Sequence, residues 1–172
     1  MKRIIFIVLL LGSGQPIYAA APQTKSSFIV QATIEKGCSL VNSEQNMDFG
    51  QHSALSQEKI TSSIINTNTT WSIKCTERMP VSVMLDAGEY FDVNHNRRMK
   101  NSSSSEYINY KLYTSSSLNT EYMAGNIYPL SPTTAANSIL DFSVYGVADL
   151  DNNNQFRSAG IYKDTVSILI SW

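Results

Sequence analysis

Two short stretches carry oxygen side chains at alternate positions, the spacing with which a calcium-binding loop begins. One is DLDNNN, which starts at Asp149, and the other is DVNHN, which starts at Asp92. A complete loop of this kind also needs a Gly at its sixth position and a Glu at its twelfth. Neither stretch has either residue at that position. We therefore interpret both stretches as solvated turns and expect no metal site.

The residues for acid–base or nucleophilic catalysis are scarce. The chain has only two histidines, His52 and His95, and both lie among polar residues. A Ser/His/Asp triad requires three groups in a fixed mutual geometry, and no spacing in this sequence indicates one. We predict that the protein is not an enzyme, and we expect no cofactor and no small-molecule substrate.

The first residues of the chain indicate export. Two basic residues precede an apolar run over residues 4–11, and three alanines follow at positions 19–21. This is the three-part layout of a secretory signal peptide, and the apolar run is too short for a membrane-spanning helix. We predict a signal peptide over residues 1–21, with the mature N-terminus between Ala20 and Pro22.

The predicted export determines how we interpret the two cysteines, Cys38 and Cys75. An exported chain with an even number of cysteines most simply pairs them, and two cysteines allow one pairing. Neither has another Cys or a His within a few residues, as common zinc-binding spacings require. We therefore predict a Cys38–Cys75 disulfide.

Composition limits the class of protein. About 150 residues remain after the signal peptide, enough for one domain with a real core. Of 13 basic residues, 2 lie in the signal peptide, so 11 face 14 acidic residues and no basic patch favours nucleic acid. Charged residues make up 16% of the chain, below the usual quarter. This composition suits an extracellular β-protein.

Apolar residues recur with period two in short runs, the pattern of half-buried β-strands. Weaker strands are expected around Phe49 and over Ile60–Ile65, although LSQEKITSSII could also form a turn or two of helix. Many short strands separated by polar turns predict an all-β antiparallel sandwich or barrel. The six clearest rows are Phe28/Val30/Ala32/Ile34, Trp71/Ile73/Cys75, Val81/Val83/Leu85, Ile108/Tyr110/Leu112, Leu140/Phe142/Val144 and Val166/Ile168/Ile170/Trp172.

Five tyrosines, at positions 107, 110, 113, 122 and 128, allow a second interpretation of the strands that carry them. Together they could form a surface on which sugars stack. On alternating strands, however, half of them should be packed in the core or against a neighbouring strand.

The last apolar row runs to Trp172 with no turn or partner strand after it. Folded proteins normally cover or blunt such an exposed strand edge. The segment Phe28–Glu35 is a suitable cover, because its four apolar side chains share one face. The pattern alone leaves two possibilities: the segment completes another molecule, or it pairs in cis with Val166–Trp172 as the first strand of its own sandwich.

From FIVQATIEKGC to its end, the chain resembles the spore coat U family, which includes the subunits of archaic, Csu-type chaperone–usher pili. The resemblance rests on several stretches in a consistent order and spacing. They are MDFGQ, IKCTE, VSVMLDAG, RRMKN, YINYKLYT, SVYGVA and AGIYKDTVSILISW.

This resemblance implies an incomplete immunoglobulin-like antiparallel β-sandwich that lacks its seventh strand and is completed by a donor strand from another subunit or a chaperone. The implied organisation is a signal peptide (1–21), an N-terminal extension with the donor strand (22–37) and a pilin domain (38–172). The implied donor residues are Phe28, Val30, Ala32 and Ile34. The implied edge of the acceptor groove is Val166, Ile168, Ile170 and Trp172.

The implied partners are a periplasmic pilus chaperone, an outer-membrane usher and neighbouring pilin subunits. The expected function is that of a shaft or adaptor subunit in a cell-surface pilus that supports adhesion or biofilm formation. Two alternatives remain open from the sequence. They are a secreted coat or matrix protein with a self-completed sandwich, and a small carbohydrate-binding module.

Overall fold

The computed structural model of the chain describes residues 26–131 and 138–172, so the predicted signal peptide lies outside the described residues. The chain divides into two units that meet between Ile34 and Glu35. Residues 26–37 form no strand. All strands therefore belong to the second unit, Glu35–Trp172.

The described part of the chain is all-β and contains no helix, which confirms the predicted class. The alternative of a helical turn in LSQEKITSSII is wrong, because Lys59–Ile65 forms a strand whose side chains alternate between the core and solvent. The strands of the described residues are β1 (Cys38–Ser39), β2 (Lys59–Ile65), β3 (Lys74–Cys75), β4 (Val81–Leu85), β5 (Arg98–Asn101), β6 (Tyr107–Tyr113), β7 (Ile127–Leu130), β8 (Ser143–Asp149), β9 (Tyr162–Lys163) and β10 (Ile168–Ser171).

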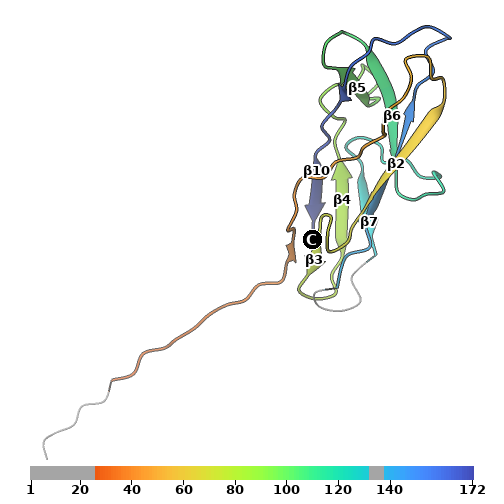
Figure 1. Cartoon of the computed structure of the whole chain (residues 1–172). Coiled ribbons are helices and arrows are strands. Elements are labelled where there is room, and N and C mark those ends of the chain that lie inside the picture. Colours follow the sequence, from red (N-terminus) through yellow and green to blue (C-terminus); the bar gives the residue numbers. More distant parts are fainter. Residues whose placement is uncertain (1–25, 132–137) are drawn as a thin grey trace, which may run out of the picture. The chain divides into compact units, whose positions relative to one another are not determined.

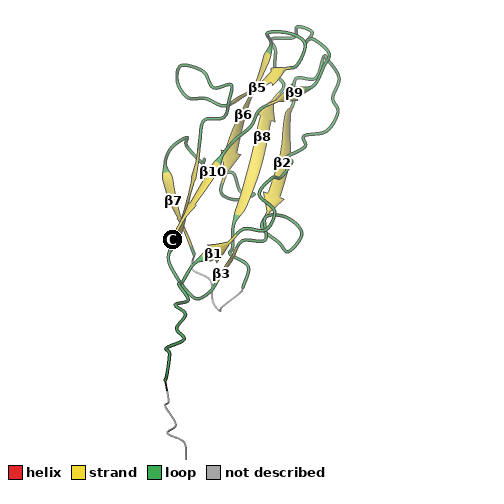
Figure 2. Ribbon diagram, turned by 90° about the vertical axis from the view of Figure 1, so that its left-hand side faces the viewer, coloured by secondary structure: helices red, strands yellow, loops and turns green. Residues whose placement is uncertain are grey.

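The strands form three antiparallel sheets (Figures 1 and 2). A five-stranded sheet has the order β2-β8-β6-β5-β9, a three-stranded sheet has the order β10-β4-β7, and β1 pairs with β3. The hydrophobic core contains side chains from both larger sheets, such as Val83 of β4 and Leu112 of β6. The two sheets therefore pack face to face as a sandwich.

The period-two rows from Trp71 to Ile170 pack in or against this core as expected, whereas the first row, Phe28/Val30/Ala32/Ile34, is exposed and does not contribute to it. In β4, β6 and β8 every second side chain is buried, because successive residues of a strand point to opposite faces. The most enclosed core side chains include Leu140, Val83 and Leu85, each no more than 1% exposed. The alternating pattern was therefore sufficient to assign the inner face of these strands.

Several expected strands are absent or shortened in the described residues. The row Phe28/Val30/Ala32/Ile34 lies in residues 26–37, which form no strand. Phe49 lies in an irregular segment, since no residue from Leu40 to Glu58 is in a strand. Trp71 and Ile73 are buried, but the strand that follows them contains only Lys74–Cys75. The buried Asn66 side chain takes the place of a partner strand here: its Oδ1 accepts from Ile73 N at 3.0 Å.

The last two strands of the chain, β9 and β10, belong to different sheets. β9 pairs with β5 in the five-stranded sheet, whereas β10 pairs with β4 in the three-stranded sheet. The chain therefore crosses from one sheet to the other at residues 164–167. Ser167 is held at this crossing by Asp86, which exchanges two hydrogen bonds of 3.0 and 3.1 Å with it.

Candidate functional site

The outer side of β9 and β10, which we call the open edge, is unpaired among the described residues. β9 is an edge strand of the five-stranded sheet, and β10 is an edge strand of the three-stranded sheet. Burial alternates without a break from Ile161 to Ser171, with even positions facing the core and odd positions facing solvent. The open edge therefore has one row of side chains that face the core and one row that faces solvent, and both rows continue from β9 to β10.

The predicted acceptor residues lie along this edge. Val166, Ile168 and Ile170 are half-buried and pack against the core. β10 is shorter than expected, because it contains only Ile168–Ser171. Val166 and Trp172 therefore lie outside the strand, and Trp172 is 59% exposed. Core-facing side chains of the neighbouring strand β4, such as Val83, are almost fully buried. The half-buried side chains of β10 therefore leave apolar surface exposed at the edge.

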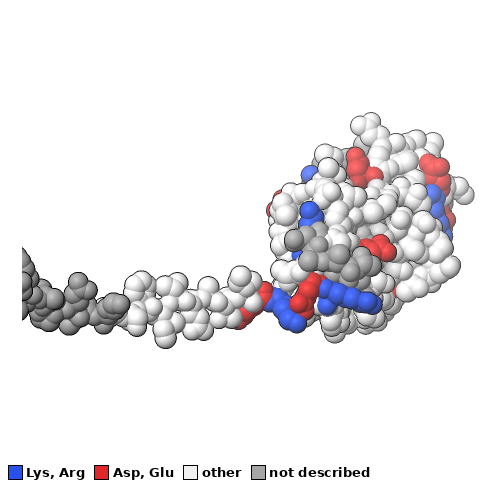
Figure 3. Space-filling view, turned by 90° about the horizontal axis from the view of Figure 1, so that it is seen from below, with Lys and Arg blue, Asp and Glu red and all other residues white. Residues whose placement is uncertain are grey.

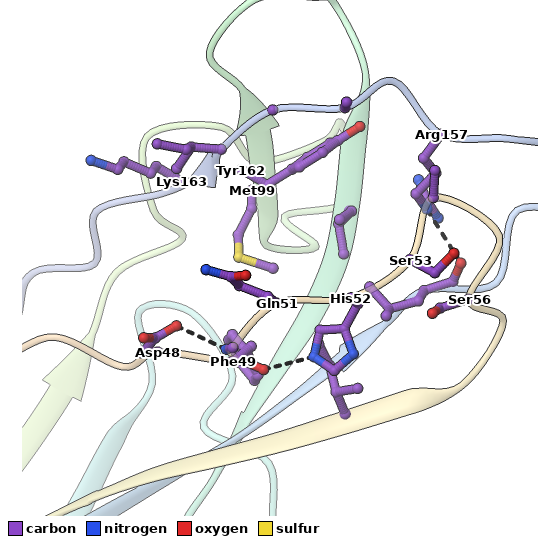
Figure 4. A pocket seen from close by; sticks show the side chains of 18 of the residues that line it. Asp48, Phe49, Gln51, His52, Ser53, Ser56, Met99, Arg157, Tyr162 and Lys163 are labelled. Atoms are coloured by element: carbon purple, nitrogen blue, oxygen red, sulfur yellow. Dashed lines mark hydrogen bonds between the residues drawn. The ribbon is translucent and has the colours of Figure 1, made fainter.

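A cavity of about 580 Å³ lies at the β9 end of this edge; we call it the end cleft (Figure 4). Its walls are the segment 46–56 and the segment 157–163. Its floor is apolar and comes from the core itself. The floor residues are Ile60, Met99, Ile108 and Leu150.

Sequence reasoning missed the end cleft. The period-two pair Met47 and Phe49 in MDFGQ was a usable signal, but it was interpreted as a strand. Both side chains pack against the core from an irregular segment. They lie over Gly146 of β8, where a Cβ atom would come within 2.8 Å of Phe49 Cζ. A side chain at this position would have to displace Met47 or Phe49, so glycine lets the wall lie close to the sheet.

Polar contacts hold the first wall in place. Asp48 Oδ1 accepts from Gly50 N at 2.8 Å, and Gly50 has a φ of 86°, which favours glycine. His52 Nε2 lies 2.8 Å from the carbonyl of Phe49, and its Nδ1 lies 3.4 Å from Glu58. Arg157 N donates to the carbonyl of Ala54 at 3.0 Å, which ties the two walls together.

A buried polar cluster supports the crossing between the sheets. Arg97, which is 3% exposed, donates to the carbonyls of Asp86 and Tyr122. Tyr110 donates its hydroxyl proton to Asp164 at 2.6 Å. Burial and this carboxylate raise the pKa of Tyr110. The cluster thus attaches residues 164–167 to the end of β4, through Asp86, and to the middle of β6, through Tyr110.

The sequence predicts a solvated turn at Asp92. In the structure, the Asp92 side chain accepts the hydrogen bonds that hold an exposed loop together. Its carboxylate accepts hydrogen bonds from Asn94 N and from the backbone and side chain of Asn96, at 2.8–2.9 Å. The side-chain bond from Asn96 is the largest cause of the lowered pKa of Asp92. Within residues 26–131 and 138–172, no group of three or more His, Cys, Asp or Glu side chains is placed to hold a metal ion.

The five tyrosines do not share one surface. Tyr110 and Tyr122 are buried, at 7% and 2% exposure. Tyr128 packs edge-on against Tyr122, with ring centroids 4.9 Å apart. Tyr107 is covered by the guanidinium of Arg98, which lies 4.3 Å from its ring centroid. Packing therefore accounts for four of these rings.

The predicted donor residues lie in the first unit. Phe28, Val30 and Ile34 are 87%, 83% and 93% exposed, and Ile29 on the opposite face is 91% exposed. Their apolar surface is therefore almost entirely exposed.

The predicted disulfide is confirmed. Cys38 and Cys75 are directly opposite each other in the β1–β3 pair and are joined by a sulfur–sulfur bond. No free cysteine occurs in the described part of the chain. The bond lies immediately after the N-terminal segment, whose last residue, Gly37, exchanges hydrogen bonds with Thr76.

Charge does not single out a binding surface on the face drawn in Figure 3. On the face seen in Figure 3, acidic and basic side chains are few and intermingled, with no large region of one sign. The described segments contain no helix that could span a membrane.

The open edge and the antiparallel sheets define an incomplete immunoglobulin-like β-sandwich. The chain belongs to the Spore Coat Protein U domain family, whose model matches residues 24–169. No curated protein matches the chain.

A solved structure has the same fold. It is the crystal structure of the CsuC–CsuE chaperone–tip adhesion subunit pre-assembly complex from archaic chaperone–usher Csu pili of Acinetobacter baumannii. The match covers 81% of this chain with a TM-score of 0.51 and 20% identity. It covers 40% of the matched chain, so this protein spans about two-fifths of that chain's length.

Proposed function

We propose that this protein is a structural subunit of an archaic chaperone–usher pilus and that it polymerises by donor-strand exchange. The observation that carries the proposal is the open edge, where half-buried apolar residues of β10 lie beside unpaired backbone groups. The N-terminal segment Ser26–Gly37 of a neighbouring subunit would occupy this edge. Such strand addition combines backbone hydrogen bonds with alternate side chains that enter pockets.

The N-terminal segment has the features that this role requires. Phe28, Val30, Ala32 and Ile34 would enter the groove, while the intervening residues would face solvent. Burying these four side chains contributes on the order of 5–10 kcal/mol before the cost of ordering the segment. A link of this strength dissociates slowly, as a fibre under tension needs.

The partners follow from the same mechanism. A periplasmic chaperone would cover the open edge before assembly, and an outer-membrane usher would replace it with the next subunit. Export through the periplasm and a place in a cell-surface pilus are parts of this proposal. The family membership and the fold shared with a protein of a chaperone–usher pilus complex support it. Adhesion and biofilm formation would be properties of the assembled fibre.

Assembly of the exported chain tests the proposal. We expect the wild-type chain to form linear oligomers by light scattering and electron microscopy. Charges at inward positions, Val30→Asp with Ile34→Asp, should leave it monomeric, because a buried unpaired carboxylate strongly opposes strand insertion. The matched control places the same charges at the outward positions Ile29 and Thr33, and it should still assemble.

Two results would contradict this mechanism. Equal assembly of the inward and outward variants would show that the segment is not inserted. A wild-type chain that stays monomeric at every concentration, and whose melting temperature is unchanged by the inward charges, would favour a coat or matrix protein with another way of covering its edge.

A further inference from the structure

Two lysines lie side by side on β9, at the open edge, and on the adjacent strand β5. Lys163 of β9 is directly opposite Lys100 of β5 in the antiparallel pair. Like charges at directly opposed positions destabilise a sheet. Lys100 has a partial partner, since its Nζ lies 5.4 Å from the ring centroid of Tyr90. Lys163 is exposed and forms no ion pair with any described residue.

Asp164 and Glu106 do not compensate Lys163, because both carboxylates have other partners. Asp164 follows it in the chain but faces the core, where its carboxylate accepts from Tyr110 and from the backbone N–H of Glu89. Glu106 is bound to Ser158 and to the Tyr162 hydroxyl. Tyr107 of β6, Lys100 of β5 and Lys163 of β9 lie opposite one another in one row across the sheet. This row therefore ends at the open edge with Lys163, whose positive charge is unpaired.

The N-terminal segment carries one acidic side chain, Glu35. By alternation, Glu35 lies on the face opposite to Phe28, Val30 and Ile34. If those apolar residues enter the groove, the carboxylate faces solvent, on the same side of the sheet as Lys163. The segment thus offers one negative charge to an edge that lacks one.

We infer that the occupant of the open edge is the N-terminal segment of a second copy of this chain, antiparallel to β9 and β10, with Glu35 opposite Lys163. The inference rests on the proposed function and specifies its partner, direction and register. The remaining pairs follow from the alternation of the two strands. They are Phe28 opposite Ile170, Val30 opposite Ile168, Ala32 opposite Val166 and Ile34 opposite Asp164.

Other arrangements fail on geometry or charge. A parallel strand with Glu35 opposite Lys163 would extend towards Phe156 and leave β10 uncovered. A shift by one residue would turn every apolar side chain to solvent. A shift by two residues would place Thr33 or Gly37 opposite Lys163 and leave the two lysines uncompensated.

The inserted strand would end at Glu35 for a reason visible in the structure. The next residue, Lys36, is ion-paired at 2.5 Å with Glu77, which is part of the segment's own subunit. Gly37 is bonded to Thr76 of that same subunit. The chain is therefore attached to its own domain immediately after the pair with Lys163.

Peptide binding to an acceptor-only chain tests the charge pair. The acceptor is the full exported chain with Val30→Asp and Ile34→Asp, which keeps the open edge but cannot donate. The probes are peptides of residues 26–37 with Glu35, with Glu35→Gln and with Glu35→Lys. We expect the Glu35→Lys peptide to bind roughly tenfold more weakly at low salt, with the Glu35→Gln peptide between the other two.

Charge reversal on the acceptor provides the control. With Lys163→Glu in the acceptor, the order should invert, so that the Glu35→Lys peptide binds best. A structural role of Lys163 alone would not produce this inversion. If the Lys163→Glu acceptor melts at a lower temperature than its parent, Lys163→Gln replaces it, and all three peptides should then bind within about twofold of one another.

A cross-link checks the direction and register directly. A peptide with Ile29→Cys should form a disulfide with Leu169→Cys in the acceptor, because both positions face solvent opposite each other. A peptide with Thr33→Cys should not. The opposite result overturns the register.

The possible failures are distinguishable. If all three peptides bind both acceptors equally, the Glu35–Lys163 pair is wrong while strand exchange stands. If no peptide binds and the melting temperature never changes, both the inference and the proposed function are wrong.

Discussion

Single side chains replace missing backbone partners at several points in this fold. Asn66 is the clearest case, since it is 6% exposed and bonds Ile73 and Leu140 at once. Its side chain donates to two carbonyl oxygens and accepts from one N–H. The irregular run before β3 is therefore stable without a neighbouring strand.

Replacing Asn66 by Leu should be costly, because it keeps the volume but leaves the Ile73 N–H and the Leu140 carbonyl buried and unpaired; the Ile73 carbonyl still accepts from Leu140 N. We expect the free energy of unfolding to fall by about 2–4 kcal/mol. Urea titration followed by tryptophan fluorescence measures this. The control, Asn68→Leu at an exposed turn position, should change it by less than about 0.5 kcal/mol. A small effect at Asn66 would mean that water satisfies these groups.

A substitution at Gly146 tests how closely the wall of the end cleft packs against β8. A methyl group at Gly146→Ala would collide with Met47 and Phe49, so we expect a loss of about 1–3 kcal/mol from overpacking. Adding Phe49→Leu should recover part of this loss, as a double-mutant cycle in denaturant can measure. Simple additivity of the two changes would show that the side chains are not in contact.

At the scale of elements, short strands are stabilised by their surroundings. The β1–β3 pair has two residues on each strand, and the disulfide joins Cys38 to Cys75 within it. Closing a loop of 37 residues restricts the unfolded chain. The bond also anchors the base of the N-terminal segment to the domain.

Removing the disulfide with Cys38→Ala and Cys75→Ala should lower the free energy of unfolding by about 2–4 kcal/mol. Reducing the wild-type protein with a thiol should have a similar effect. The double variant is the control, because its stability should not respond to the thiol. A wild-type protein equally stable in both conditions would contradict a stabilising bond.

At the scale of the molecule, the two larger sheets share one hydrophobic core, which contains the buried side chains of Tyr110 and Tyr122. Burial raises the pKa of Tyr122 to about 12, and burial with the Asp164 carboxylate raises that of Tyr110 further. In the unfolded chain a tyrosine ionises near a pKa of ~10. The native state therefore favours the protonated hydroxyls.

The free energy of unfolding should consequently fall as pH rises from about 10 to 12, because the unfolded chain loses these protons first. The Tyr122→Phe variant should show a smaller fall over the same range, measured by urea titrations at each pH. Identical slopes for the variant and the wild type would contradict a protonated native Tyr122.

The sequence alone determined the inner faces of β4, β6 and β8, because alternation with a period of two requires no knowledge of the partner strand. It also determined the cysteine pairing, since only one pair exists. The position of Phe49, the short β3 and the crossing at residues 164–167 were decided by tertiary structure. Each depends on a side-chain contact that the alternating pattern does not encode: Phe49 with Gly146, Ile73 with Asn66, and Ser167 with Asp86. The juxtaposition of Lys100 and Lys163 likewise exists only once two strands far apart in the chain are paired, which no local pattern encodes.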